Sequence, residues 1–219
     1  MPDDLNKVVY EGESEDSSQD IRDDPSLRDL GTEVVTVRVE GTEKSFLVDK
    51  ALLCFYSVYF RNTCMGAFSE ADERATRVEG TSLITFRRFM KWLYTRKIIV
   101  YANPKEDRLD LAQRSLLNLY IFADRYDVRH LRNNVMRAWV SLRVQRPGRC
   151  SYEVVVKAFG NLPTNSAFCR FLVRDFGDRW VPRADDECER MLWSRLPTEF
   201  FDGGPHAPGG TTLPRLGIS

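Results

Sequence analysis

The hydrophobic pattern of the chain changes its period at Asp49, and this change constrains the fold more than any other feature. Before Asp49, a β-branched run at 34–39 and a second short run at 44–48 flank the turn signal at 40–43, which predicts a β-hairpin. After Asp49, apolar residues follow the spacing of one helical face, as Leu52, Phe55, Tyr56, Tyr59 and Phe60. Asp49 is a suitable N-cap, so we expect the hairpin to lead directly into a helix.

Beyond this point the pattern alternates short strands with helices and then becomes helical only. Residues 75–78 and 98–101 are predicted strands, and Ser57 is either a mid-helix residue or the N-cap of a second short helix. Thr81 or Ser82 opens the helix between the two strands. Later helices are expected at 109–126, 128–142, 152–159, 166–180 and 187–196. This order predicts an α+β fold in which a small sheet is covered by helices.

Charge is divided unevenly along a chain whose formal net charge is zero. Residues 1–29 carry ten acidic and three basic residues, and the rest of the chain carries 22 acidic and 29 basic residues. Because the first segment also has few apolar residues, it cannot offset its ordering entropy, and we expect a disordered acidic arm at 1–31. Such an arm either adds solubility or acts as an electrostatic latch on the basic body. The Gly/Pro-rich stretch 202–219 predicts a disordered tail.

The polar stretch 143–149 contains Pro147-Gly148 and has the composition of a linker. It divides the ordered part into a predicted domain at 32–144 and a C-terminal helical extension at 145–201. The helices of the extension are rich in Phe, Leu and Trp, which would form a large apolar patch if left uncovered. We therefore expect the extension to pack on the helix 128–142, whose Trp139 and Leu142 lie beside the linker.

The cysteine and histidine content argues against metal and disulfide sites. The cysteines are Cys54, Cys64, Cys150, Cys169 and Cys188. Their number is odd and no CxxC motif occurs, which fits a reducing intracellular compartment better than a disulfide framework or a zinc site. No apolar run approaches the roughly 18 residues that span a bilayer, and the acidic N-terminus lacks the apolar stretch of a secretory signal. We therefore expect a protein of the cytoplasm or nucleus.

No pattern of residues predicts catalysis or cofactor binding. The chain has no glycine-rich phosphate loop, no Gly-x-Ser-x-Gly and no His-Glu-x-x-His. Asp124 and Asp127 are spaced like paired carboxylates, but Arg125 and Arg129 interleave with them, which is typical of a salt-bridged helix surface. His130 has neither a cysteine nor a second histidine near it and is expected to cap or pack. We expect no enzyme activity, no cofactor and no metal site.

Several segments, taken in order, resemble a BTB/POZ domain. They are the hairpin and helix start at 35–39 and 44–54, Ser57-Val58-Tyr59-Phe60, Phe68-Ser69-Glu70, the helix 86–95 ending in Leu-Tyr-Thr, and the Ala-Asp-x-Tyr helix 119–126 followed by Leu131. The chain is similar to this family over about 32–142, and most similar in character to BTB proteins of filamentous fungi, in which further helices follow the domain. Three positions depart from the family pattern. Glu33 replaces an aspartate, Asp49 a histidine and Arg96 a glycine.

The resemblance implies a non-catalytic protein–protein interaction module that homodimerises and binds partner proteins. In this family the first strand and the first helix pair across the dimer, and the run 34–39 is expected to be an edge strand with unpaired backbone groups. The resulting candidate dimer interface is Val35, Val37, Val39, Leu52, Phe55, Tyr56 and Tyr59. The aromatic residues of the first helices either all lie in the core, or one or two of them form the dimer contact.

Two narrower roles remain as alternatives. One is a substrate adaptor of a cullin-based ubiquitin ligase, for which the family uses a hydrophobic-x-Glu triplet; here the x-Glu at Lys105-Glu106 follows Pro104. The other is a transcription-associated scaffold without its own DNA-binding element, because no Cys/His zinc finger occurs. The expected partners are a second copy and unidentified proteins, with a cullin as the alternative. Nucleic acid and membrane are not expected.

Overall fold

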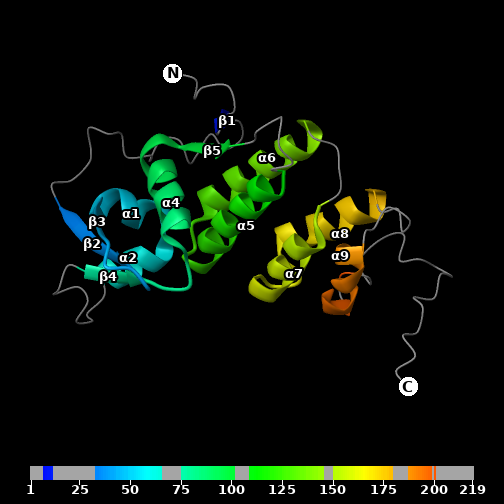
Figure 1. The fold of residues 1–219 in the computed structure, drawn as a ribbon. Helices are drawn as coiled ribbons and strands as arrows, with labels where there is room; N and C mark the ends of the chain where they lie inside the picture. The colour runs from blue at the N-terminus through cyan, green and yellow to red at the C-terminus, as the bar shows by residue number, and fades with distance from the viewer. Residues whose placement is uncertain are drawn as a thin grey trace. The chain divides into compact units, whose positions relative to one another are not determined.

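The computed structural model describes residues 7–11, 33–65, 75–101, 109–145, 150–179, 187–198 and 200. The chain divides into two compact units, Met1–Val144 and Gln145–Ser219, and each is described by itself (Figure 1). The predicted tail 202–219 lies outside the described residues, as do Phe68-Ser69-Glu70 and the segment around Pro104.

A three-stranded sheet forms one end of the first unit. Strands β2 (Val34–Val39) and β3 (Ser45–Asp49) form the expected antiparallel hairpin, in which Thr36 pairs with Leu47. Strand β4 (Ala75–Val78) pairs with β2 in parallel on its other side, so the order is β3-β2-β4. The prediction that 34–39 is an edge strand is therefore wrong, because β4 satisfies the side of β2 that the hairpin leaves open.

Alternation along β2 gives the sheet one buried and one exposed face. Val35, Val37 and Val39 are buried, whereas Val34 and Arg38 are exposed. This is the pattern of a sheet with one face covered by helices and one face in solvent, which confirms the predicted α+β architecture.

Two short helices follow the sheet, and each begins at a side-chain cap. The Asp49 carboxylate accepts the Leu52 N–H at 2.8 Å and starts α1 (Lys50–Tyr56). The Ser57 hydroxyl accepts the Phe60 N–H at 3.1 Å and starts α2 (Val58–Met65). Ser57 is thus an N-cap rather than a mid-helix residue. Its hydroxyl also donates to the Tyr126 carbonyl at 2.6 Å, which ties the junction of α1 and α2 to a distant part of the chain.

Three longer helices are described in the rest of the first unit. Helix α4 (Leu83–Thr95) starts at the Ser82 cap, α5 is Leu109–Arg125 and α6 is Arg129–Gln145. Helix α6 extends past its predicted end into the stretch expected to be a linker, because Arg143 is buried and continues the inward face of Trp139 and Leu142. The rest of that stretch, 146–149, lies outside the described residues.

Aromatic side chains dominate the core between these helices. The rings of Phe60 and Tyr126 stack at 5.4 Å between centroids, and Phe89 lies 4.7 Å from Phe122. Phe86 extends the cluster toward the sheet through Phe46, at 5.0 Å. Each buried side chain of this size contributes roughly 1.5–3 kcal/mol, so the cluster holds α2, α4 and α5 against one another.

A second, two-stranded sheet was not predicted. Strand β1 (Lys7–Glu11) pairs antiparallel with β5 (Lys97–Tyr101), with Val9 opposite Ile99 (Figure 1). Strand β1 lies within the arm 1–31 that was expected to be disordered; the other residues of that arm lie outside the described residues. The apolar run Val8-Val9-Tyr10 has the β propensity that such a strand requires.

The second unit is helical, as expected. The elements that the structure describes there are α7 (Tyr152–Asn161), α8 (Ala167–Arg179), α9 (Glu187–Met191) and the 3-10 turn η2 (Trp193–Arg195). Helices α7 and α8 pack together, with Tyr152 5.3 Å from Phe176 between ring centroids. Phe176 also contacts Phe200 at 5.1 Å, so the unit has an apolar core of its own. The predicted packing of this extension on 128–142 stays a prediction.

Candidate protein-interaction surface

Most of the residues expected at a dimer interface lie in the core of the first unit. Five of the seven candidates, Val35, Val37, Val39, Leu52 and Tyr56, are at most 5% exposed. The other two are Phe55, which is half-buried, and Tyr59, which is 41% exposed. Only these two have side-chain surface that a partner can contact without a rearrangement of the unit.

Phe55 and Tyr59 belong to a small apolar region that we call the α1–α2 surface, composed of Phe55, Val58 and Tyr59. Val58, the first residue of α2, is 44% exposed. Val58 lies outside the predicted apolar stripe and was not among the candidate interface residues. Three partly exposed apolar side chains within five positions make the kind of contact region that aromatic anchors dominate in protein interfaces.

Hydrogen bonds and ring contacts hold the α1–α2 surface in place. Arg61 donates from Nε to the Cys54 carbonyl at 2.9 Å and from Nη2 to the Phe55 carbonyl at 3.2 Å, which satisfies the last carbonyls of α1. The Tyr59 ring lies 5.0 Å from Tyr126 in an edge-to-face arrangement. A surface fixed in this way loses little conformational entropy when it binds.

Arg96 occupies the position where the family pattern has glycine. Its φ of 58° is in the left-handed region, which ends α4. The guanidinium lies 3.9 Å from the centre of the Tyr56 ring, and its Nη1 donates to the carbonyls of Trp92 and Leu93 at the end of α4. The backbone of Arg96 ends α4, and its side chain also caps the last carbonyls of that helix. The guanidinium covers one face of the Tyr56 ring.

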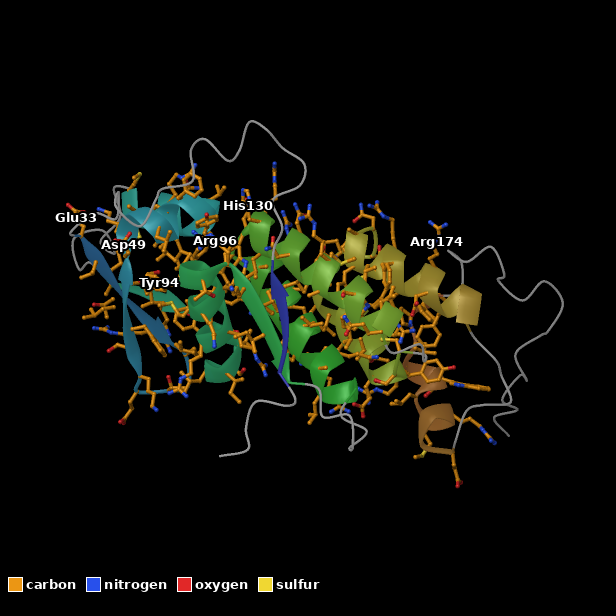
Figure 2. The ribbon with its side chains drawn as sticks, turned by 90° about the horizontal axis from the view of Figure 1, so that it is seen from above. Glu33, Asp49, Tyr94, Arg96, His130 and Arg174 are labelled. Carbon is orange, nitrogen blue, oxygen red and sulfur yellow. The ribbon has the colours of Figure 1, made fainter. Side chains whose placement is uncertain are left out.

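His130 lies on another side of the same tyrosine. Its ring is edge-to-face with Tyr56 at 5.6 Å between centroids, and Figure 2 shows Arg96 and His130 close to each other. The expectation that His130 has a packing role is confirmed by this ring contact. Tyr56 thus contacts Arg96, His130, Trp92 and its neighbour Phe55, so it supports Phe55, one residue of the α1–α2 surface.

The other two departures from the family pattern also have structural roles. Besides capping α1, Asp49 donates its backbone N–H to the Tyr94 hydroxyl at 3.1 Å. Glu33 accepts a hydrogen bond from Lys50 Nζ at 3.0 Å, and this bond and the charge of Glu33 raise the pKa of Lys50. Figure 2 shows Glu33, Asp49 and Tyr94 grouped at the sheet end of α1. The acidic residues at 33 and 49 therefore join β2, α1 and α4.

Asp124 and Asp127, which the sequence spaces like paired carboxylates, form an ion-pair cluster with Arg132. Arg132 Nη1 lies 2.8 Å from Asp124 Oδ1, and its Nη2 lies 3.4 Å from Asp127 Oδ1. The salt-bridged surface is confirmed, but its cation is Arg132 rather than Arg125 or Arg129. Arg125 instead donates to the Glu79 carbonyl at 3.0 Å. This arrangement is structural, since one guanidinium bridges both carboxylates at the turn between α5 and α6.

Within the described part of the chain, no group of three or more His, Cys, Asp or Glu residues is placed to hold a metal ion. A cavity of about 20 Å³ between α4, β5 and α5, lined in part by Arg88, Lys91 and Lys97, has room for a water molecule but not for a cofactor. None of the helices that the structure describes is long and apolar enough to cross a bilayer.

Comparison with known proteins decides the family. The family model of the BTB/POZ domain matches residues 27–139. The chain belongs to the BTB/POZ family. BTB domains are protein–protein interaction modules and are generally not catalytic, and the resemblance seen in the sequence is confirmed for the family. The similarity to BTB proteins of filamentous fungi stays a prediction.

Two solved BTB structures are similar to this chain. The BTB domain of zebrafish PATZ1 has 21% sequence identity and a TM-score of 0.37, and the match covers 49% of this chain and 75% of that chain. The BTB domain of human gigaxonin has 16% identity and a TM-score of 0.35, covering 47% of this chain and 74% of that chain. No curated protein matches the chain.

Proposed function

We propose that this BTB/POZ protein homodimerises and binds partner proteins through the α1–α2 surface. The observation that carries the proposal is the side-by-side exposure of Val58 and Tyr59, 44% and 41%, on a helix whose backbone and rings are held by Ser57, Arg61 and Tyr126. Apolar and aromatic side chains presented on a rigid element are the usual anchors of protein interfaces.

The seven candidate interface residues divide into two roles in this proposal. Phe55 and Tyr59 make the contact, together with Val58. The buried residues Val35, Val37, Val39, Leu52 and Tyr56 support the contact region from the core. Tyr56 is the direct link, because its ring lies 4.8 Å from that of Phe55.

The α1–α2 surface is too small to account for a stable dimer by itself. A stable interface buries about 800 Å² on each partner, far more than three side chains supply. We therefore propose that the outward face of the three-stranded sheet, where Val34 is 48% and Leu47 is 69% exposed, adds to the contacts with a second copy or a partner.

Sedimentation velocity over a range of concentrations tests the homodimer. The reduced full-length chain is expected to shift from monomer to dimer as its concentration rises through the micromolar range. A monomer at every concentration would exclude self-association and leave only the binding of other proteins.

Capture of partners from an extract, followed by mass spectrometry, tests the second part of the proposal. The wild-type chain and a Tyr59→Glu variant are compared, with Leu111→Glu as a control at an exposed residue of α5. Proteins lost only with Tyr59→Glu are partners of the α1–α2 surface. A cullin among them would select the ubiquitin-ligase adaptor, and a DNA-binding regulator would select the transcription-associated scaffold. We place these interactions in the cytoplasm or nucleus.

A further inference from the structure

Cys54 of α1 and Cys64 of α2 lie at the contact between the two helices. The Cys54 thiol is 3.9 Å from the Phe60 carbonyl, which belongs to the helical turn that leads to Cys64. The Cys54 carbonyl accepts a hydrogen bond from Arg61, in the same turn of α2, at 2.9 Å. Two contacts therefore hold Cys54 against the turn that carries Cys64.

The two thiols also interact with each other. Both cysteines are in the thiol form, and their side chains are hydrogen-bonding partners. That hydrogen bond, together with burial, raises the pKa of the Cys54 thiol. A disulfide bond requires the two sulfur atoms to come within roughly 2.05 Å, and the contact of the Cys54 thiol with the turn that leads to Cys64 places Cys54 beside its partner.

Two basic side chains act on the pair, and one of them, Lys50, is also ion-paired with Glu33. Lys50 and Arg61 both lower the pKa of Cys54 and so oppose the effect of burial, and Lys50 also interacts with Cys64. Cys54 is 4% exposed, whereas Cys64 is half-buried and is the thiol that a dissolved oxidant reaches first. A partly exposed cysteine beside cations is the environment in which a thiolate forms and reacts.

We propose that Cys54 and Cys64 are a redox-active pair, which a peroxide converts into a reversible disulfide that links α1 to the end of α2. The segment between the two cysteines contains Phe55, Val58 and Tyr59. The disulfide would therefore close a loop around the whole α1–α2 surface. Formation of the disulfide is argued from the positions of the two cysteines alone. An effect of the disulfide on partner binding rests on the proposed function.

The oxidation proceeds in two balanced steps. The Cys64 thiolate attacks hydrogen peroxide, the O–O bond breaks, and the sulfur becomes a sulfenic acid while the Cys64 proton leaves in a water molecule. The Cys54 sulfur then attacks the Cys64 sulfur and the S–O bond breaks; the departing hydroxide takes the Cys54 proton and leaves as a second water. Two thiols and one peroxide thus give one disulfide and two water molecules. A dithiol reductant reverses the change by exchange.

Peptide mapping of the full-length protein tests the pair directly. Arg61 lies between the two cysteines, so trypsin separates them into peptides 51–61 and 62–74. After treatment with hydrogen peroxide and alkylation, these two peptides are expected to be joined by a disulfide that a dithiol removes. Cys64 is expected to be alkylated at least about tenfold faster than the buried Cys169 in the reduced protein.

Single cysteine variants provide the controls. Cys54→Ser is expected to leave the Cys64 sulfenic acid without a partner, so that dimedone traps it, and Cys169→Ser is expected to form the disulfide as the wild type does. The inference is overturned if wild-type Cys64 remains a sulfenic acid with no joined peptide. It is also overturned if the disulfide joins two copies of peptide 62–74, which would mean an intermolecular bond. Both of these outcomes are measured on the wild-type protein, so they remain decisive even if a cysteine variant folds poorly.

Discussion

The Nε of Arg96 donates a hydrogen bond to the Tyr56 hydroxyl at 2.8 Å while its guanidinium lies over the same ring. This contact compensates for an arginine backbone in the left-handed region, where a side chain costs roughly 1–2 kcal/mol relative to glycine. It also connects the end of α4 to α1, and thereby to the side of the unit that carries the α1–α2 surface.

Replacement of Arg96 separates the cost of its left-handed backbone from the benefit of its side-chain contacts. Arg96→Ala keeps the unfavourable backbone and loses the contacts, so we expect the free energy of unfolding to fall by about 1–3 kcal/mol. Arg96→Gly loses the same contacts but relieves the backbone, and should be about 1 kcal/mol more stable than the alanine variant. Urea denaturation measures both. An alanine variant as stable as the glycine variant would show that the backbone at this position is not strained.

Ser57 is expected to be among the most sensitive polar positions. Ser57→Ala removes the cap of α2 and the donor to the Tyr126 carbonyl, and should lower the free energy of unfolding by about 1–3 kcal/mol. Ser45→Ala, at an exposed serine of β3, is the matched control and should change stability by less than about 0.5 kcal/mol. Equal effects of the two substitutions would mean that the hydrogen bonds of the Ser57 hydroxyl, including the one to the Tyr126 carbonyl, do not stabilise the fold.

Tyr126 is expected to make stability depend on alkaline pH. Burial raises the pKa of Tyr126 above its ordinary value of 10.0, although its hydrogen bond to Glu79 acts in the opposite direction. A raised pKa in the folded state means that the Tyr126 contribution is complete below pH 10 and is lost as the pH rises through the folded-state pKa. The difference in unfolding free energy between wild type and Tyr126→Phe should therefore shrink at high pH. A difference independent of pH would contradict this.

The C-terminal extension is predicted to cover an apolar side of the first unit. A chain that ends at Arg149 should be less soluble and should bind a hydrophobic dye, because each apolar side chain that loses its cover forfeits roughly 1.5–3 kcal/mol of burial. Dye fluorescence and the thermal midpoint of the shortened chain measure this. If the shortened chain is as soluble and as stable as the full chain, the extension is an independent unit, and a partner-binding role for it is the better interpretation.

The local parts of this fold could be predicted from the sequence because their signals are short-range. The hairpin, the Asp49 and Ser57 caps and the helical stripes each depend on residues a few positions apart. The pairing of β1 with β5 and of β4 with β2 could not, because each joins strands that are far apart in the sequence and carry no signal for a partner.

The candidate site likewise has local features that could be predicted from the sequence and long-range contacts that could not. Alternation in β2 places Val35, Val37 and Val39 on one apolar face, but it does not say whether helices of the same chain or a second copy cover that face, and here it is buried within the unit. The ten-residue spacing of Cys54 and Cys64 likewise gives no sign that they belong to contacting helices. The Cys54 thiol meets the turn of α2 that leads to Cys64 because α1 and α2 pack against each other.

A comparison of Val58→Glu with Leu111→Glu by sedimentation velocity tests the central claim most directly. Both residues are exposed apolar side chains on helices, at 44% and 56%, so each substitution adds the same charge to a solvent-facing position. At a concentration where the wild type is dimeric, we expect Val58→Glu to sediment as a monomer and Leu111→Glu as a dimer, both with wild-type circular dichroism. A folded Val58→Glu variant that remains dimeric would contradict the assignment of the dimer contact to the α1–α2 surface.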